Sequence, residues 1–178
     1  PSATFVAYDY PSMLITAKDH YRQEPTHKRE DESKVQLVGG AGDTLPFRDE
    51  SFDHSFSSLL FHWAKDADKI TQEMHRVMKP GGNFVVSTIH PDYFKAGDFE
   101  TKDGNNYTFR KTRDTSQPQE IDVMLNQTIG PVTYYLRPVE QYKRMFEESG
   151  FQNVAVEAPV FSNEAQLQEN EHLRRYRN

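Results

Sequence analysis

The sequence contains no cysteine, so the chain cannot form a disulfide, bind an iron–sulfur cluster through thiolates or use a thiol nucleophile. A chain without cysteine fits a reducing compartment, and we expect the cytoplasm. The seven histidines show no paired spacing of the kind that zinc sites use. We therefore predict that the protein holds no metal ion.

Long apolar runs and an excess of positive charge are also missing. No run approaches the roughly 18 apolar residues of a membrane-spanning helix, and the first residues lack the pattern of a signal peptide. The net charge is -6 and the mean hydropathy is -0.84, so the chain has no general attraction for nucleic-acid phosphates or anionic lipid. The composition predicts a soluble protein whose partner is a small molecule, or a protein, rather than a membrane or a nucleic acid.

Enough apolar sequence remains for one globular domain. The chain has 178 residues, of which 35% are hydrophobic, and this length can bury a substantial core. Apolar segments of strand length alternate with helical segments and short turns, which is the pattern of a parallel α/β sheet. We predict a single α/β domain over residues 1–178 with a doubly wound, mostly parallel sheet.

The periodicity of the sequence also places the individual elements. Strands are predicted at 5–8, 35–38, 52–60, 83–89 and 151–157, and helices at 13–22, 66–77 and 138–149. Residues 90–137 interrupt the alternation with a polar stretch and two further strands, at 123–130 and 132–136. We expect this segment to be an insertion on the substrate side of the sheet. Residues 158–178 are expected to form a polar tail with a weak helical stretch.

Several phrases occur in a fixed order between the second predicted strand and the fourth. Gly40-Ala41-Gly42-Asp43 precedes Leu45-Pro46-Phe47, Ser51-Phe52-Asp53 opens the next strand, and Lys79-Pro80-Gly81-Gly82 follows the helix. This ordered set resembles the cofactor half of class I S-adenosylmethionine-dependent methyltransferases, in particular the type 11 methyltransferase-like domain. The resemblance extends over about residues 3–158, and it implies a Rossmann-like fold with S-adenosyl-L-methionine as cofactor.

The resemblance also implies which residues bind the cofactor. Asp9 matches the carboxylate that accepts hydrogen bonds from both ribose hydroxyls, with Tyr10 beside it; a loop aspartate that only caps the next helix is the alternative. The loop Gly40, Ala41, Gly42 and Asp43 corresponds to the segment that reads adenine, although Ala41 replaces the usual aspartate there. A plain glycine turn is the alternative for this loop.

The end of the strand at 52–60 is implied to line the methionine part of the cofactor. The residues concerned are Ser57, Ser58 and Leu59. His62 follows at the start of the loop, where it positions a substrate or takes a proton; a structural hydrogen bond is the alternative. The neighbouring Trp63 is expected to be a packing residue.

The segment after the strand at 83–89 is the other place for chemistry. His90 is the general-base candidate because the unperturbed pKa of histidine lies near neutrality. Asp92 and Tyr93 are predicted to contact the substrate. The alternative is a proline-containing loop with exposed polar side chains.

Two parts of the family pattern are missing from the sequence. The family's strand and glycine-rich turn would precede Phe5, and its last apolar strand would follow the tail. Three explanations stay open: an incomplete product, a piece supplied by another chain, or a degenerate domain that binds a partner. We expect a truncated or partial methyltransferase domain that transfers methyl groups, with a catalytically inactive binding module as the alternative; self-association is possible through an unpaired sheet edge.

Overall fold

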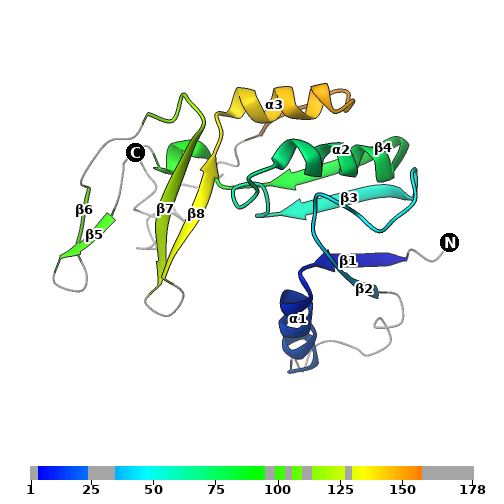
Figure 1. Cartoon of the computed structure of the whole chain (residues 1–178), viewed down its shortest axis with the longest axis horizontal. Coiled ribbons are helices and arrows are strands. Elements are labelled where there is room, and N and C mark those ends of the chain that lie inside the picture. The colour runs from blue at the N-terminus through cyan, green and yellow to red at the C-terminus, as the bar shows by residue number, and fades with distance from the viewer. Residues whose placement is uncertain are drawn as a thin grey trace, which may run out of the picture.

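The structure is a computed structural model that describes residues 4–23, 35–94, 99–102, 106–109, 114–126 and 130–157. Figure 1 shows its strands grouped in pairs, with helices beside the parallel ones. The parallel pairs are β1 (Phe5–Asp9) with β2 (Val35–Gly39), and β3 (Phe52–Ser58) with β4 (Met78–Ser87). Helix α1 (Pro11–Gln23) follows β1, and α2 (Ala67–Val77) connects β3 to β4.

The rest of the described chain is built from antiparallel hairpins and one more helix. The strands are β5 (Phe99–Lys102) paired with β6 (Asn106–Phe109), and β7 (Gln119–Asn126) paired with β8 (Gly130–Leu136). A short 3-10 helix, η2 (Pro91–Phe94), follows β4, and α3 (Val139–Glu148) follows β8. The β5–β6 hairpin lies where the sequence analysis expected only a polar stretch.

The parallel pairs and their helices confirm the predicted α/β class. In each of the two parallel pairs the second strand runs beside the first after a long connection, as parallel pairing requires. The connection between β3 and β4 is a strongly amphipathic helix that begins at Ala67 and ends at Val77, within one residue of the predicted range.

Strand β4 begins earlier than predicted, directly after α2. Phe52 pairs with Met78, and the next aligned pair is His54 with Asn83, so residues 79–82 bulge out of the ladder. Gly81 takes a left-handed φ of 79°, and a Cβ on Gly82 would lie 2.7 Å from the Asp53 carbonyl oxygen. The Pro-Gly-Gly segment is therefore an irregularity within β4, and the helix has already ended when the chain reaches it.

The main core lies between α2, α3 and one face of the β3–β4 pair (Figure 1). Phe84 and Val86 of β4 pack against this core, whereas Phe56 and Val85 pair in register on the opposite face and are 65% and 57% exposed. A smaller cluster joins η2 to the β7–β8 hairpin. Its buried members are Phe94, Ile121, Tyr134 and Leu136.

The strand predicted at 151–157 is wrong, because these residues form no strand in the structure. Phe151 of this segment packs against the core instead of pairing in a sheet. The centroid of its ring lies 5.5 Å from that of Phe84 and 5.1 Å from that of His75. The predicted helical stretch of the tail lies outside the described residues.

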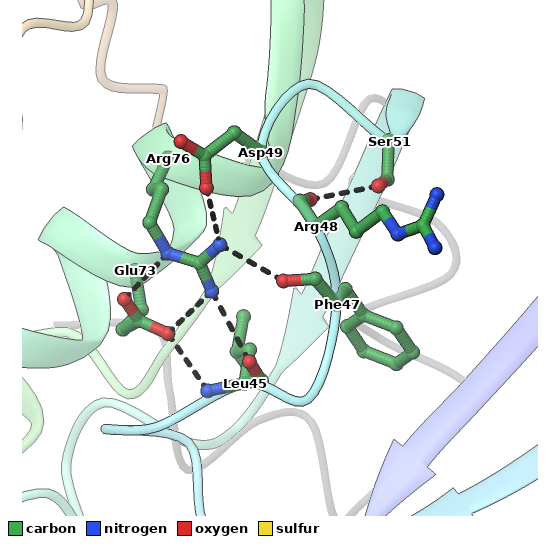
Figure 2. Close-up of polar contacts among 7 residues, drawn as sticks. All are labelled: Leu45, Phe47, Arg48, Asp49, Ser51, Glu73 and Arg76. Atoms are coloured by element: carbon green, nitrogen blue, oxygen red, sulfur yellow. Dashed lines mark hydrogen bonds and ion pairs between the residues drawn. The ribbon is translucent and has the colours of Figure 1, made fainter.

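Arg76 joins helix α2 to the loop that leads into β3 (Figure 2). Its guanidinium donates to both carboxylate oxygens of Glu73 at 2.8 Å and to Asp49 Oδ1 at 2.7 Å. It also donates to the carbonyl oxygens of Leu45 and Phe47, while Glu73 accepts from the Leu45 N–H. This network fixes the Leu45-Pro46-Phe47 phrase against α2, which gives the phrase a structural role.

The network should make the folded chain less stable at low pH. The hydrogen bonds from Arg76 lower the pKa of Glu73, so the folded chain releases this proton more readily than the unfolded chain. The stabilisation is present above the unfolded pKa of about 4.3 and is lost as the pH falls through the folded value. We expect Glu73→Gln to lower the midpoint of thermal unfolding at pH 7 and to flatten its dependence on pH below about 5.

The measurement is a set of melts followed by circular dichroism from neutral pH to pH 3. Glu148→Gln is the matched control, because Glu148 is an exposed residue near the end of α3 and should leave the profile unchanged. Equal acid sensitivity of the wild type and Glu73→Gln would contradict the proposed linkage.

Candidate functional site

The first group of predicted site residues, Asp9, Tyr10 and the loop 40–43, lies at the carboxyl ends of β1 and β2. Ligands in open parallel α/β sheets bind beyond these ends. The Asp9 carbonyl oxygen accepts a hydrogen bond from the Gly40 N–H at 3.1 Å, so the turns after β1 and β2 touch. The Asp9 carboxylate accepts the Tyr10 N–H at 2.7 Å, and the side chains of Asp9 and Tyr10 are both exposed.

The loop after β2 is held by a tyrosine that the sequence analysis missed. The Tyr8 hydroxyl donates to the Ala41 carbonyl oxygen at 2.8 Å, and a Cβ on Gly40 would collide with that hydroxyl. Burial, and to a lesser degree the negative charge of Asp43, raises the pKa of Tyr8. At Gly42 a Cβ would meet the Ile70 side chain at an ordinary 3.5 Å. The close backbone approach at Gly40 is therefore an internal contact with Tyr8.

The end of β3 contains an unusual backbone conformation. Leu59 has a φ of 54°, which is uncommon for a residue with a Cβ, and its N–H donates to the Ser87 carbonyl oxygen at 2.8 Å. The hydroxyls of Ser58 and Ser87 lie 3.4 Å apart. Ser57 pairs with Val86 on the helix-covered face, and its Oγ is buried without a hydrogen-bond partner among the described residues. The turn at Leu59 thus joins β3 to the loop that carries His62.

His62 is buried in this loop, with only 2% of its surface exposed. Its Nδ1 lies 3.3 Å from Thr88 Oγ1, and its ring packs edge-on against Tyr134 with centroids 4.8 Å apart. Burial lowers the pKa of His62 because the charged imidazolium loses hydration. Trp63 is 40% exposed and also packs against Tyr134, at 4.7 Å. The packing role expected for Trp63 is therefore present in the structure.

The second group of predicted residues lies on and before η2. His90 is exposed, and its Nδ1 lies 3.2 Å from the Asp92 N–H, while Asp92 Oδ1 accepts the Thr115 hydroxyl at 3.0 Å. The Tyr93 ring is 44% exposed and lies 5.0 Å from the Phe94 ring. These three side chains thus remain accessible to a ligand, as a substrate contact requires.

Tyr134 connects the two groups. Its ring contacts His62 and Trp63 on one side and the Phe94 ring, at 5.7 Å, on the other. Through Phe94 the aromatic series reaches Tyr93. No sequence motif predicts this role, because Tyr134 is only one of two adjacent tyrosines in an apolar strand.

Two negative observations concern the described part of the chain only. None of its helices is long and apolar enough to cross a membrane. Within the same residues, no group of three or more histidine, aspartate or glutamate side chains is arranged to hold a metal ion.

Known proteins resemble this chain in sequence over part of its length. Residues 2–86 match the family model of the methyltransferase domain. A malonyl-[acyl-carrier protein] O-methyltransferase of Coxiella burnetii is 40% identical over 72 residues, which is 40% of this chain and 26% of that protein. An enzyme of the same name from Erwinia pyrifoliae is 35% identical over 75 residues, covering 42% of this chain and 29% of that protein. The chain thus spans less than a third of these relatives.

Solved structures cover nearly the whole chain. An S-adenosylmethionine-dependent methyltransferase from Mesorhizobium loti superposes with a TM-score of 0.67 at 23% identity, covering 97% of this chain and 74% of that one. A protein from Listeria monocytogenes described as a methyltransferase of the same kind gives a TM-score of 0.72 at 19% identity, covering 98% and 75%. The methyltransferase-domain model thus matches residues 2–86, and the chain shares the fold of these S-adenosylmethionine-dependent methyltransferases.

Proposed function

We propose that the chain binds S-adenosyl-L-methionine at the carboxyl ends of β1 to β4 and takes part in methyl transfer to a small-molecule acceptor. The observation that carries the proposal is the Asp9 carboxylate, which is exposed at the end of β1 beside the glycine loop. One of its oxygens receives the Tyr10 N–H. Because a carboxylate has about four acceptor sites, it keeps capacity for two further donors, which is what a ribose diol presents.

The remaining cofactor contacts are proposed at the carboxyl ends of β2 and β3. Gly40, Ala41, Gly42 and Asp43 lie beside Asp9 and would face the adenine, with the Ala41 carbonyl oxygen already accepting from Tyr8. Ser57 and Ser58 end β3, and these residues and the turn at the following Leu59 would border the methionine part. The bound cofactor supplies an electrophilic methyl group on a sulfonium, and transfer needs chiefly that the acceptor be held in line with it.

His90 is proposed as the residue that receives a proton from the acceptor. Its exposed imidazole follows β4, and Asp92 and Tyr93 beside it would contact the acceptor. His62 suits a different role: its ring is buried, burial lowers its pKa, and its Nδ1 lies beside Thr88 Oγ1, so we propose that it serves as a hydrogen-bonding group inside the loop.

The methyl acceptor is proposed to be a small molecule chosen by residues 90–137. Two of the curated relatives are named for methylating malonyl-[acyl-carrier protein], and their alignments cover 72 and 75 residues of this chain. The family match ends at residue 86, before η2 and both hairpins. The matched part therefore supports the cofactor proposal and leaves the acceptor to the hairpins.

The first test is binding of S-adenosylhomocysteine to the full 178-residue chain. At about 100 times its dissociation constant, a ligand adds roughly 2.7 kcal/mol of stability, which raises the melting midpoint by several degrees. NAD⁺ at the same concentration is the control for a general dinucleotide site. A cooperative melt that does not move with S-adenosylhomocysteine would favour the inactive binding module over the methyltransferase.

The role of Asp9 predicts a selective loss of cofactor affinity. Asp9→Asn keeps the shape but removes the charge and places an NH₂ donor where an acceptor is needed. We expect the dissociation constant of S-adenosylhomocysteine, measured by calorimetry, to rise about tenfold or more. Asp19→Asn on α1 is the matched control, since Asp19 is exposed on the same unit. Equal affinity of Asp9→Asn and wild type would remove Asp9 from the ribose site.

The role of His90 predicts loss of turnover with binding retained. Removing a general base typically costs a factor of about 100 or more in rate, and cofactor affinity should stay within a factor of about two in His90→Ala. Transfer of a labelled methyl group to an acceptor found by screening measures the rate, with His20→Ala on α1 as the control. Normal turnover in His90→Ala would exclude this histidine from the mechanism.

A further inference from the structure

Arg137, at the end of β8, binds a loop that belongs to another part of the fold. Its side chain is 7% exposed, and both terminal guanidinium nitrogens donate to backbone carbonyl oxygens. Nη2 donates to Ala64 and Lys65 at 2.7 Å each, and Nη1 donates to Phe61 at 3.2 Å and to Tyr135 at 3.3 Å. Three of these four acceptors lie in the loop between β3 and α2.

These contacts satisfy carbonyl groups that the loop cannot satisfy itself. Residues 61–66 form turns, so their carbonyl oxygens lack the regular partners of a helix or strand. Arginine carries only donors, arranged in a planar fork, and can therefore serve several carbonyls from one side chain. Lysine concentrates its donors on one nitrogen and matches this arrangement poorly. The buried charge of Arg137 is thus compensated by the dipoles of the loop.

The same loop and hairpin are joined by two more contacts. The Tyr135 N–H donates to the His62 carbonyl oxygen at 2.8 Å, and the Tyr134 ring packs on His62 and Trp63. Arg137 closes this set at the end nearest α2, where Ala64 and Lys65 lead into the helix. Residues 134–137 therefore hold the loop from His62 to Lys65 along its length.

We propose that Arg137 is a positioning residue that fixes the loop from Phe61 to Lys65 against the β7–β8 hairpin, so that His62 and Trp63 keep their places at the methyl-transfer site. The cofactor part of this inference rests on the proposed function. The loop joins the end of β3, proposed to border the cofactor, to a hairpin within the segment proposed to choose the acceptor. Loss of the clamp should release the loop without removing any residue that touches a ligand.

Trp63 reports on the loop directly because it is the only tryptophan in the chain. The variants are Arg137→Met, which keeps much of the stem but no donors, and Arg137→Lys, which keeps the charge. Arg144→Met on α3 is the matched control, because Arg144 is exposed. Acrylamide quenching of Trp63 and calorimetric titration with S-adenosylhomocysteine are measured well below each melting midpoint, after circular dichroism has shown native helix content.

Trp63 is 40% exposed in the wild type, so its release would raise the quenching constant up to about twofold. We expect such a rise in both Arg137 variants, larger in Arg137→Met, and none in Arg144→Met. Where Arg137→Met does not fold, Arg137→Lys decides the outcome. Unchanged quenching in a folded Arg137 variant would overturn the proposal, even if its melting midpoint has fallen, because a merely stabilising residue behaves in that way.

The titration separates this inference from the proposed function. If the wild type binds S-adenosylhomocysteine, we expect its dissociation constant to rise several-fold in the Arg137 variants; a released loop with unchanged affinity would overturn the positioning role. If the wild type does not bind, the cofactor proposal fails, and the quenching result alone decides whether Arg137 clamps the loop.

Discussion

The burial of Phe61 is the constraint on which the site depends. This side chain is completely buried, and its ring lies 5.5 Å from Phe146 of α3 and 6.5 Å from Phe84 of β4. It follows the left-handed turn at Leu59, so the chain leaves β3 and enters the core within three residues. Removing a buried phenylalanine typically costs about 3–5 kcal/mol, so the packing of Phe61 can hold an unfavourable backbone conformation at Leu59 in place. His62 and Trp63 come next along the chain.

The two structural arginines stabilise loops in opposite environments. Arg76 is partly exposed and pairs with Glu73 and Asp49, and these carboxylates raise its own pKa further. Each exposed ion pair contributes little to the free energy of unfolding. The Arg76 guanidinium also binds two carbonyl oxygens, so it holds the loop through hydrogen-bond geometry as well as through charge. Arg137 is buried, and its guanidinium donates to four carbonyl oxygens. Both use the planar fork of arginine to bind carbonyl oxygens of a loop.

The elements that the sequence predicted well are those whose pattern is local. The amphipathic period of α2 and the apolar run of β3 each indicate the element from a short stretch of sequence. The observed bounds of both elements agree closely with the predicted ones. The segment 151–157 was predicted as a strand because its apolar residues look the same whether they pair in a sheet or pack as a loop. Phe151 packs against the rings of His75 and Phe84, which are distant along the chain, and no local pattern contains that information.

The candidate site shows the same division. The family phrases assigned Asp9, the glycine loop and His62 to the candidate site. They did not predict that the Tyr8 hydroxyl donates to the Ala41 carbonyl oxygen, or that His62 is buried. Arg137 could have been suspected only from a basic residue directly after an apolar strand and before Pro138, which is a weak signal. Its three partners in the loop lie more than 70 positions away along the chain, so the contact becomes visible only once β8 and the loop are placed together.

The two sides of the proposed cofactor site differ in how tightly they pack against the rest of the described chain. On one side, the loop with His62 is fixed by Phe61, Tyr134 and Arg137, all of them buried. On the other, the β1–β2 unit that carries Asp9 meets the β3–β4 pair mainly through a ring series, in which Phe47 lies 5.7 Å from Tyr8 and 5.0 Å from Phe52. A ligand that contacts both sides would stabilise them against local opening, and the effect would be larger for the more weakly attached β1–β2 unit. Cofactor binding should therefore protect the backbone amides of β1 and β2 from hydrogen exchange more than those of β3 and β4.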